Sequence, residues 1–170
     1  MPKIPSQIVD FSLYNLNDRL MGHGDEITLP KITSLTSEVD LAAGKIDVPG
    51  MRTENMEMEI PFNLFDEEAA GVVSLNKVTT VVVRGSAQKM DTESHNFDYS
   101  GLKVTAKGFS KEVDLGTLKR SDKMDSKITL TLTYIKVEDA EGNVFIEHDK
   151  LNGTLIINGE DVREGISQYL

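Results

Sequence analysis

The alternation of apolar and polar residues over residues 101–137 constrains the fold of this chain more than any other feature. Two runs within this stretch place apolar residues at every second position, with mainly lysine or threonine between them. Successive side chains of a β-strand point to opposite faces of its sheet, so the pattern predicts two strands that bury one face and present the other. The apolar positions are Leu102, Val104 and Ala106 in the first run, which Gly108 interrupts, and Ile128, Leu130, Leu132 and Tyr134 in the second.

The second run changes phase at Ile135, because Ile135 and Val137 are apolar whereas Lys136 and Glu138 are polar. An extra residue within a strand moves the side-chain alternation by one position. We therefore predict a β-bulge at this point, in preference to a change in burial.

The rest of the chain is typical of a mainly β protein. Residues 63–74 predict one short helix, capped by Asn63 and packed through Leu64, Phe65, Ala69 and Val72. Residues 36–55 lack sustained periodicity and predict a long hairpin or projecting loop, and residues 87–100 read as a polar loop. Further strands are expected over residues 9–14, 19–21, 26–29, 56–62 and 77–84, with turns at 15–18, 139–143 and 158–159 and a short helix or arm over 161–170.

Length, charge and composition narrow the class of protein. A chain of 170 residues suits a single domain, 1–170, with a full-sized core. The formal net charge of −10 opposes a general attraction to nucleic acid or to anionic membranes. With no cysteine, the chain forms neither disulfides nor thiolate metal sites, and no apolar window has the length of a membrane span. We expect a soluble protein, without membrane anchoring, made in a cytoplasm.

The charges are unevenly distributed along the chain. Residues 26–68 hold ten acids and three bases, whereas residues 101–136 hold eight bases and four acids. Opposite patches of this kind can meet between subunits. The alternative is that both are ordinary solvated faces.

The residues that could carry chemistry do not form a recognisable reaction centre. Three histidines (His23, His95 and His148) lack the spacing of metal ligands. The segment 139–143 lacks the closing glutamate of a calcium loop, and Gly22-His23-Gly24 lacks the lysine and hydroxyl residue of a phosphate loop. We therefore predict no enzyme activity, no metal and no cofactor.

Two groups of charged residues on predicted strands remain candidates for contacts. Glu57 and Glu59 lie two residues apart and point the same way, which favours an acidic sheet face over an acid/base pair because nothing separates their pKa values. The row Lys103, Lys107 and Lys111 could contact phosphate, but no aromatic residues interleave with it to stack bases. An outer face or a subunit contact is the favoured interpretation of this row.

Residues 28–162 resemble the major tail tube proteins of contractile-tailed phages and of the related R-type tail bacteriocins. The order and spacing of several short segments over most of the chain carry the resemblance. They are Leu29-Pro30-Lys31-Ile32, Ala43-Gly44, Val48-Pro49-Gly50-Met51, Met56-Glu57-Met58-Glu59-Ile60, Val83-Arg84-Gly85-Ser86, residues 107–116, residues 126–134, His148-Asp149-Lys150-Leu151-Asn152 and Asn158-Gly159-Glu160-Asp161.

The resemblance implies an antiparallel β-sandwich or partly closed barrel, the tail-tube fold, with a short flanking helix and a long projecting loop or hairpin. It implies six-membered rings that stack into a hollow tube inside a contractile sheath, which conducts DNA or punctures an envelope. The implied partners are further copies of the chain, the sheath protein, a baseplate or tube initiator, the tail terminator and a tape measure protein in the lumen. DNA would pass without sequence-specific binding, and the tube would belong to a virion or phage-like particle assembled in the bacterial cytoplasm.

The same resemblance suggests roles for particular residues. Residues 1–8 would form an N-terminal stacking arm, and the loop 36–55 would contact a neighbouring subunit or ring. We hypothesise that Glu57 and Glu59 face the lumen, whereas Lys103, Lys107 and Lys111 face the sheath or a neighbour. The charged residues of the inter-subunit loop are Glu38, Asp40, Lys45, Asp47, Arg52 and Glu54.

Three other functions compete with this interpretation. The nearest is the tube component of a type VI secretion system, which shares the general architecture. A β-sandwich module that binds carbohydrate or protein would display exposed aromatic platforms, but only 6% of the residues are aromatic. An enzyme is the weakest candidate, since the residues to build its site are not visible.

Overall fold

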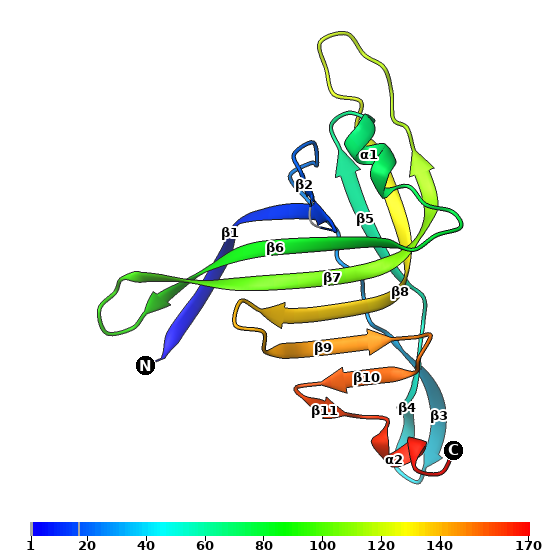
Figure 1. The fold of residues 1–170 in the computed structure, drawn as a ribbon. Helices are drawn as coiled ribbons and strands as arrows, with labels where there is room; N and C mark the ends of the chain where they lie inside the picture. The colour runs from blue at the N-terminus through cyan, green and yellow to red at the C-terminus, as the bar shows by residue number, and fades with distance from the viewer. Residues whose placement is uncertain (1, 17) are drawn as a thin grey trace.

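The computed structural model describes residues 2–16 and 18–170 and consists mainly of antiparallel strands (Figure 1). Eight strands follow the order β11-β10-β9-β8-β7-β6-β1-β2, β5 joins this sheet through β8, and β3 and β4 pair only with each other. The elements are β1 (Lys3–Asn15), β2 (Asp18–Leu20), β3 (Ser34–Leu41), β4 (Gly44–Thr53), β5 (Met56–Phe62), α1 (Glu67–Val72), β6 (Thr79–Asp91), β7 (Phe97–Asp114), β8 (Ser126–Asp139), β9 (Val144–Asp149), β10 (Thr154–Ile157), β11 (Glu160–Asp161) and α2 (Glu164–Ser167).

The large sheet divides along β8. One side of β8 pairs with β7, but its other side pairs with β5 up to Leu132 and with β9 from Tyr134 onward. Between these two halves, the pairing with β7 passes from Leu132 to Tyr134 and leaves Thr133 as an extra residue. The predicted bulge is confirmed, and it lies where the sheet changes its partner strand.

The bulge also corrects one assignment. The alternation placed Tyr134 on the core face with Leu132, but Tyr134 lies opposite Lys107 on the polar face. Ile135 returns to the core face and is buried. The sheet is curved and is not a closed barrel, so the fold-class prediction of a mainly β, partly closed structure is confirmed.

The core lies on the inner face of this curved sheet. Alternate residues of β5 and β8 are buried there, in agreement with the pattern in the sequence. Burial of each large aliphatic side chain contributes about 1.5–3 kcal/mol. The largest fully buried side chains are Phe62, Leu13, Met56, Met58, Ile60, Ile128, Leu130, Val72 and Val81.

Helix α1 covers part of this core through Ala69 and Val72, but its start differs from the prediction. Asp66, not Asn63, is the N-cap, and its carboxylate accepts hydrogen bonds from the backbone N–H groups of Glu68 and Ala69. Asn63 instead continues the extended chain after β5, where its N–H donates to the carbonyl of Gly22. Leu64 is exposed and does not join the predicted packing stripe.

Two predicted segments are wrong in part. Residues 26–29 do not form a strand, because only an isolated bridge joins Thr28 to Glu59. Residues 87–100 are not a loop, since β6 continues to Asp91 and β7 begins at Phe97. This part of the sheet projects from the core with both faces largely solvated, so its sequence lacks the apolar alternation that identifies a half-buried strand.

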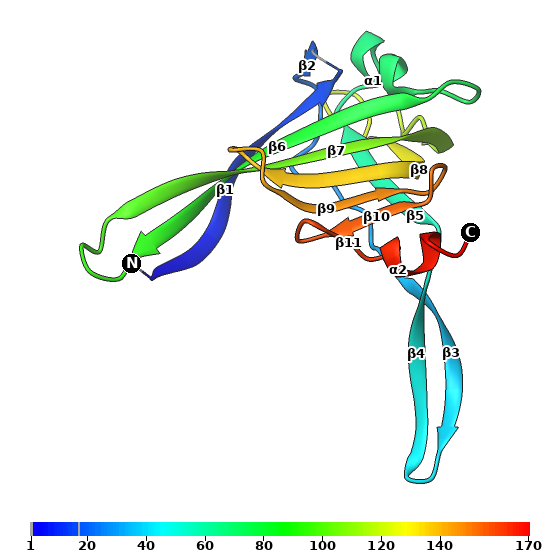
Figure 2. The same cartoon turned by 60° about the horizontal axis from the view of Figure 1, so that its bottom comes forward.

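Two extensions leave the core in different directions (Figures 1 and 2). The first is a three-stranded arm, formed by the start of β1, the end of β6 and the start of β7. The second is the long β3–β4 hairpin predicted over residues 36–55. The expected N-terminal arm, residues 1–8, is part of the first extension from Lys3 onward, while Met1 lies outside the described residues, as does Asn17 of the predicted first turn.

The C-terminal region also follows the sequence. Asn158 and Gly159 have φ of 53° and 82° and form the predicted tight turn between β10 and β11. Residues 161–170 contain the short helix α2, one of the two alternatives expected there.

Gly108 marks the bulge on the β7 side, and its lack of a side chain is required there. A Cβ atom at this position would lie 2.1 Å from the backbone oxygen of Thr131. We expect Gly108→Ala to lower the free energy of unfolding by about 2 kcal/mol or more, because backbone must move to relieve the clash. Urea denaturation measures this change. Gly165→Ala is the matched control, since a Cβ there meets no atom within 4 Å; equal stability of both variants would contradict the role of Gly108.

Candidate assembly surfaces

The polar face of the large sheet, opposite the core, brings the predicted glutamates and lysines together. Glu57 and Glu59 lie on β5 opposite Thr131 and Thr129 of β8. The ammonium group of Lys111 donates a hydrogen bond to Glu57, and Lys127 Nζ lies 3.6 Å from Glu59 Oε1. Each glutamate therefore has a cationic partner within its own subunit.

These contacts affect the titration of the first pair. The hydrogen bond and charge of Lys111 hold the pKa of Glu57 below its ordinary value, and the same contact raises the pKa of Lys111. Because the folded-state pKa of Glu57 is lowered, any stabilisation from the pair is present at neutral pH and is lost as the pH falls through that pKa.

The other two lysines of the predicted row lie on the same polar face. Lys103 Nζ is 3.5 Å from Glu138 Oε1, and Lys107 Nζ lies 4.9 Å from the centroid of the Tyr134 ring. The hypothesis assigns Glu57 to the lumen and Lys111 to the sheath or a neighbour, and the structure brings these two residues into contact on one face. The face is a mosaic of paired charges rather than an acidic strip and a basic strip.

The β3–β4 hairpin has one apolar and one charged face. Its strands pair Val39 with Ile46 on the apolar face, and both side chains are exposed. On the charged face Glu38 lies directly opposite Asp47, while Asp40 lies opposite Lys45. Lys45 Nζ is 3.1 Å from Glu38 Oε1 and 3.8 Å from Asp40 Oδ1.

Arg52 and Glu54, the other two charged residues assigned to this loop, lie at the base of the hairpin. Arg52 belongs to the end of β4, and Glu54 follows that strand. The backbone N–H of Glu54 donates to the carbonyl of Thr33 and closes the base. Of the six predicted residues, four are therefore grouped on the charged face and two are not.

The base of the hairpin is anchored to the point where the large sheet divides. Buried His148 of β9 makes hydrogen bonds with Thr53 Oγ1 at 2.9 Å and with the carbonyl of Thr154 at 3.1 Å. Lys150 Nζ donates to the carbonyl of Glu54 at 2.6 Å. These contacts fix the position from which the hairpin leaves the body of the protein.

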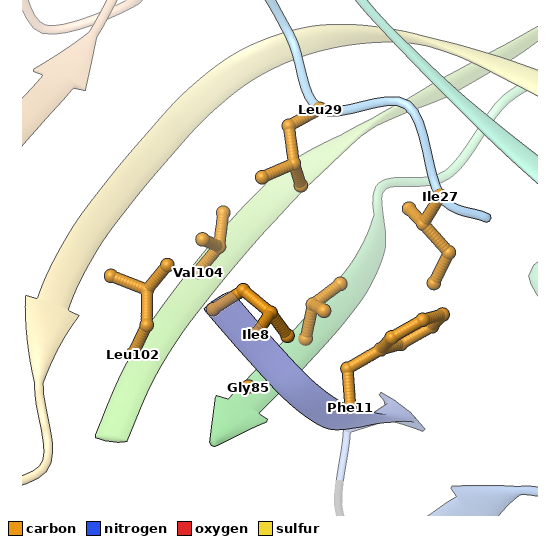
Figure 3. A pocket seen from close by; sticks show the side chains of 8 residues that line it. Ile8, Phe11, Ile27, Leu29, Gly85, Leu102 and Val104 are labelled. Atoms are coloured by element: carbon orange, nitrogen blue, oxygen red, sulfur yellow. The ribbon is translucent and has the colours of Figure 1, made fainter. Parts of the chain in front are cut away.

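A second surface feature is an apolar groove of about 160 Å³ at the root of the three-stranded arm (Figure 3). The side chains of Ile8, Phe11 and Leu102 line it from the sheet, and those of Ile27 and Leu29 lie across from them. The lining residues offer apolar contact and no charged or hydroxyl side chain. The groove is suited to apolar packing rather than to polar chemistry.

The tip of the three-stranded arm carries exposed apolar side chains. Ile4 of β1 lies opposite Met90 of β6, which lies opposite Phe97 of β7. Tyr99 is exposed on the same arm. Exposed apolar clusters of this kind are common at contacts between proteins.

Within residues 2–16 and 18–170, no group of three or more metal-binding side chains comes together. No helix among these residues is both long and apolar enough to span a membrane.

Reasoning from the sequence missed two contributors to these surfaces. Lys127 ends the basic stretch that was expected to face the sheath or neighbouring acids, and its pairing with Glu59 of the same subunit was not foreseen. His148 was tested only as a metal ligand, whereas it anchors the hairpin. The available signal of burial was that His148 occupies the same alternate positions of its strand as Val144 and Ile146, but nothing local indicates a partner 95 residues away.

Comparison with known proteins gives a family match over nearly the whole chain. The family described as phage tail tube protein FII matches residues 5–170. The tail tube protein of Escherichia phage P2 is 27% identical over 146 residues, which cover 82% of each chain.

Solved structures with a similar fold come from contractile injection systems. The sheath/tube terminator of an extracellular contractile injection system has a TM-score of 0.56 at 11% identity, covering 79% of this chain and 96% of the other. The sheath-tube complex of such a system has a TM-score of 0.52 at 10% identity, covering 79% and 91%. The tube-terminating cap of the anti-feeding prophage also has a TM-score of 0.52, at 12% identity, covering 76% and 88%.

We expect Lys111→Met to raise the pKa of Glu57 toward the ordinary glutamate value, because the substitution removes the donor and the positive charge that lower it. Carbon-13 NMR titration of the Glu57 carboxyl group measures this change. Lys103→Met is the control, since Lys103 lies against Glu138 instead. An unchanged Glu57 pKa in the Lys111 variant would show that the pair does not form in solution.

Proposed function

The chain belongs to the phage tail tube protein FII family and is a structural tail tube subunit, and we propose that its copies form stacked six-membered rings inside a contractile sheath. The observation that carries the proposal is the family match over residues 5–170. The tail tube protein of phage P2, similar over 82% of both chains, supports a tube that conducts DNA. This match favours a phage-type tube over a type VI secretion tube or a binding module.

The proposed partners follow from the same relationships. Structures with this fold come from a sheath-tube complex, a sheath/tube terminator and a tube-terminating cap, which supports a sheath protein and a tail terminator as partners. A baseplate or tube initiator and a tape measure protein complete the proposed set. The protein would act in the tail of a virion or phage-like particle after assembly in the bacterial cytoplasm, with a mechanical role and no catalysis.

The edges of the large sheet support a role in a ring. The first part of β1 pairs with β6 on one side, while the short β2 covers only its end at residues 13–15. Open sheet edges favour pairing with another chain unless something covers them. Joining identical copies around a closed ring would cover these edges.

The β3–β4 hairpin is the segment that we propose to contact a neighbouring ring. A two-stranded hairpin is only marginally stable alone, so one that exposes an apolar face gains most from a partner. Its anchor through His148 supports this role, because a fixed base presents the hairpin in one direction.

We further propose that the polar face carrying Glu57 and Glu59 lines the channel. Threonine residues and paired charges would offer phosphate groups little net attraction. This extends the original hypothesis for the two glutamates: Lys111 and Lys127 would share the channel wall with them, and the balance of charge would matter more than acidity alone. Lys103 and Lys107 would lie on the continuation of that face, toward a neighbouring subunit or the sheath.

Electron microscopy of the purified protein at high concentration, and of the particles that contain it, tests the proposed assembly. We expect hollow tubes built of stacked rings from the parent protein. A variant in which Gly-Gly replaces residues 35–52 should fold but form no tubes, because the hairpin pairs only with itself and the large sheet does not depend on it.

The folded state of the hairpin deletion is checked by circular dichroism and thermal unfolding, with the parent protein as control. Tubes formed by this variant would contradict the role of the hairpin. If the parent protein forms only isolated globular particles under every condition, including inside intact particles, the proposed function itself is wrong.

Removing the two glutamates tests the proposed channel face. Glu57→Gln with Glu59→Gln leaves Lys111 and Lys127 without their acidic partners, so the wall gains two positive charges per subunit. We expect normal tubes but DNA release slowed by about twofold or more, because unpaired lysines attract phosphate. Dye fluorescence during DNA release from purified virions measures the rate.

The matched control also replaces Lys111 and Lys127 with Gln. It removes both members of each pair, restores the balance of charge, and should release DNA at the parent rate. Equal rates of DNA release for the parent and the two-glutamate variant would contradict the proposal that Glu57 and Glu59 line the channel.

A further inference from the structure

The charged face of the hairpin holds more negative charge than its own lysine can balance. Three carboxylates (Glu38, Asp40 and Asp47) share this face with Lys45, which lies close to the first two. Glu38 and Asp47 are direct cross-strand neighbours. Like charges in this arrangement destabilise a strand pair. The arrangement is most favourable when a cation from outside the hairpin lies beside it.

The chain also carries a group of bases that its own acids do not balance. Four other bases in residues 101–136 form ion pairs within the subunit, namely Lys103, Lys111, Lys127 and Lys136. In contrast, no ion pair within the described residues involves Lys119, Arg120 or Lys123. All three are exposed in the β7–β8 loop, residues 115–125, which we call the basic loop.

Hydrogen bonds at its base hold the basic loop in place. Thr117 N–H donates to the carbonyl of Met124 at 2.9 Å, and Met124 N–H donates to the carbonyl of Asn63 at 2.8 Å. Gly116, in the same loop between β7 and β8, has a φ of 82°, a conformation that favours glycine. The three bases therefore project from a defined position.

The acids near the basic loop are mostly engaged elsewhere. Asp122 accepts a hydrogen bond from the backbone N–H of Lys123 within the loop, and Asp125 lies at its end. Asp66 caps α1, and Glu68 accepts hydrogen bonds from the N–H groups of Met21 and Gly22, while Glu67 lies in the first turn of that helix. None of these carboxylates forms an ion pair with the three bases among the described residues.

The hairpin and the basic loop lie at opposite ends of the molecule in both views (Figures 1 and 2). The hairpin, in cyan, extends from the bottom, and the loop between β7 and β8 lies at the top. Complementary surfaces at opposite ends join copies head to tail and produce an open filament. Opposite charge at such contacts also fixes their orientation.

We infer that the charged face of the hairpin in one copy docks on the basic loop of a second copy in the adjacent ring. Glu38, Asp40 and Asp47 receive Lys119, Arg120 and Lys123 of that neighbour. This assignment rests on the proposed stacking of rings. It adds the surface that the hairpin contacts and the head-to-tail direction in which rings stack.

A charge-exchange experiment tests the contact. Lys119→Glu with Arg120→Glu and Lys123→Glu should leave a folded protein that forms about tenfold less sedimentable tube than the parent, because like charges then face each other. Inverting the hairpin as well, by Glu38→Lys, Asp40→Lys, Lys45→Glu and Asp47→Lys, should restore tubes. Sedimentation and electron microscopy measure both effects, and raising the salt from about 0.05 M to about 0.5 M should weaken parent stacking.

The matched control changes the same number of charges at three exposed bases outside the basic loop, through Arg19→Glu, Lys31→Glu and Lys77→Glu. It should stack better than the loop variant. Normal tubes from the loop variant, loss of sheath binding alone, or failure of the inverted hairpin to rescue stacking would each overturn the inference. The proposed function would survive any of these outcomes as long as the parent forms tubes.

Discussion

The extra residue Thr133 in β8 is the constraint on which the rest of the structure depends. Before it, β8 pairs with β5 and buries Leu132; after it, the strand pairs with β9 and Tyr134 faces the polar side. A regular strand would keep a single partner along this edge, and the sheet would continue as one layer. The bulge lets the sheet divide around a core, and the gap between the two partner strands is the place from which the hairpin leaves. Gly108 makes this possible on the neighbouring strand, since a side chain there would meet the carbonyl of Thr131.

Some charged side chains have a partner of opposite charge within their own subunit, and others do not. Glu57 and Glu59 have lysine partners on the polar face, where solvent screens exposed pairs so that they contribute little to stability. Their importance is therefore in the surface that they create, which has local polarity but little net charge. The hairpin and the basic loop are different, because each retains charge that only a partner can match. In the proposed tube, where copies associate at one surface and DNA passes along another, this division separates the two tasks.

The sequence predicted best what depends on regular periodicity. The buried apolar positions of β5 and of β8 up to Leu132, and the phase change at Ile135, follow from side-chain alternation and were predicted correctly, whereas Tyr134 was placed on the wrong face. Strand segments in the arm were missed because neither face is buried, so no alternation marks them. The helix cap was assigned to Asn63 because residue type alone does not show that Asp66 is the residue whose carboxylate reaches the free N–H groups. Long-range pairs were beyond the sequence for a similar reason: the contacts of Lys111 with Glu57 and of His148 with Thr53 depend on how the sheet divides.

The excess of carboxylates on the charged face of the hairpin also opposes the pairing of two free subunits through their hairpins. A projecting hairpin has two open edges and an apolar face, which together favour pairing with any similar strand. Two copies that approached through their hairpins would bring Glu38, Asp40 and Asp47 of each against the same residues of the other, and the repulsion would disfavour this contact. The basic loop lies at the far end of the molecule, so it attracts the hairpin of another copy only when the two copies approach head to tail. Charge placed in this way selects between two associations that apolar contact alone would not distinguish, and it does so before the surfaces touch, since electrostatic attraction acts over about 10 Å at moderate salt.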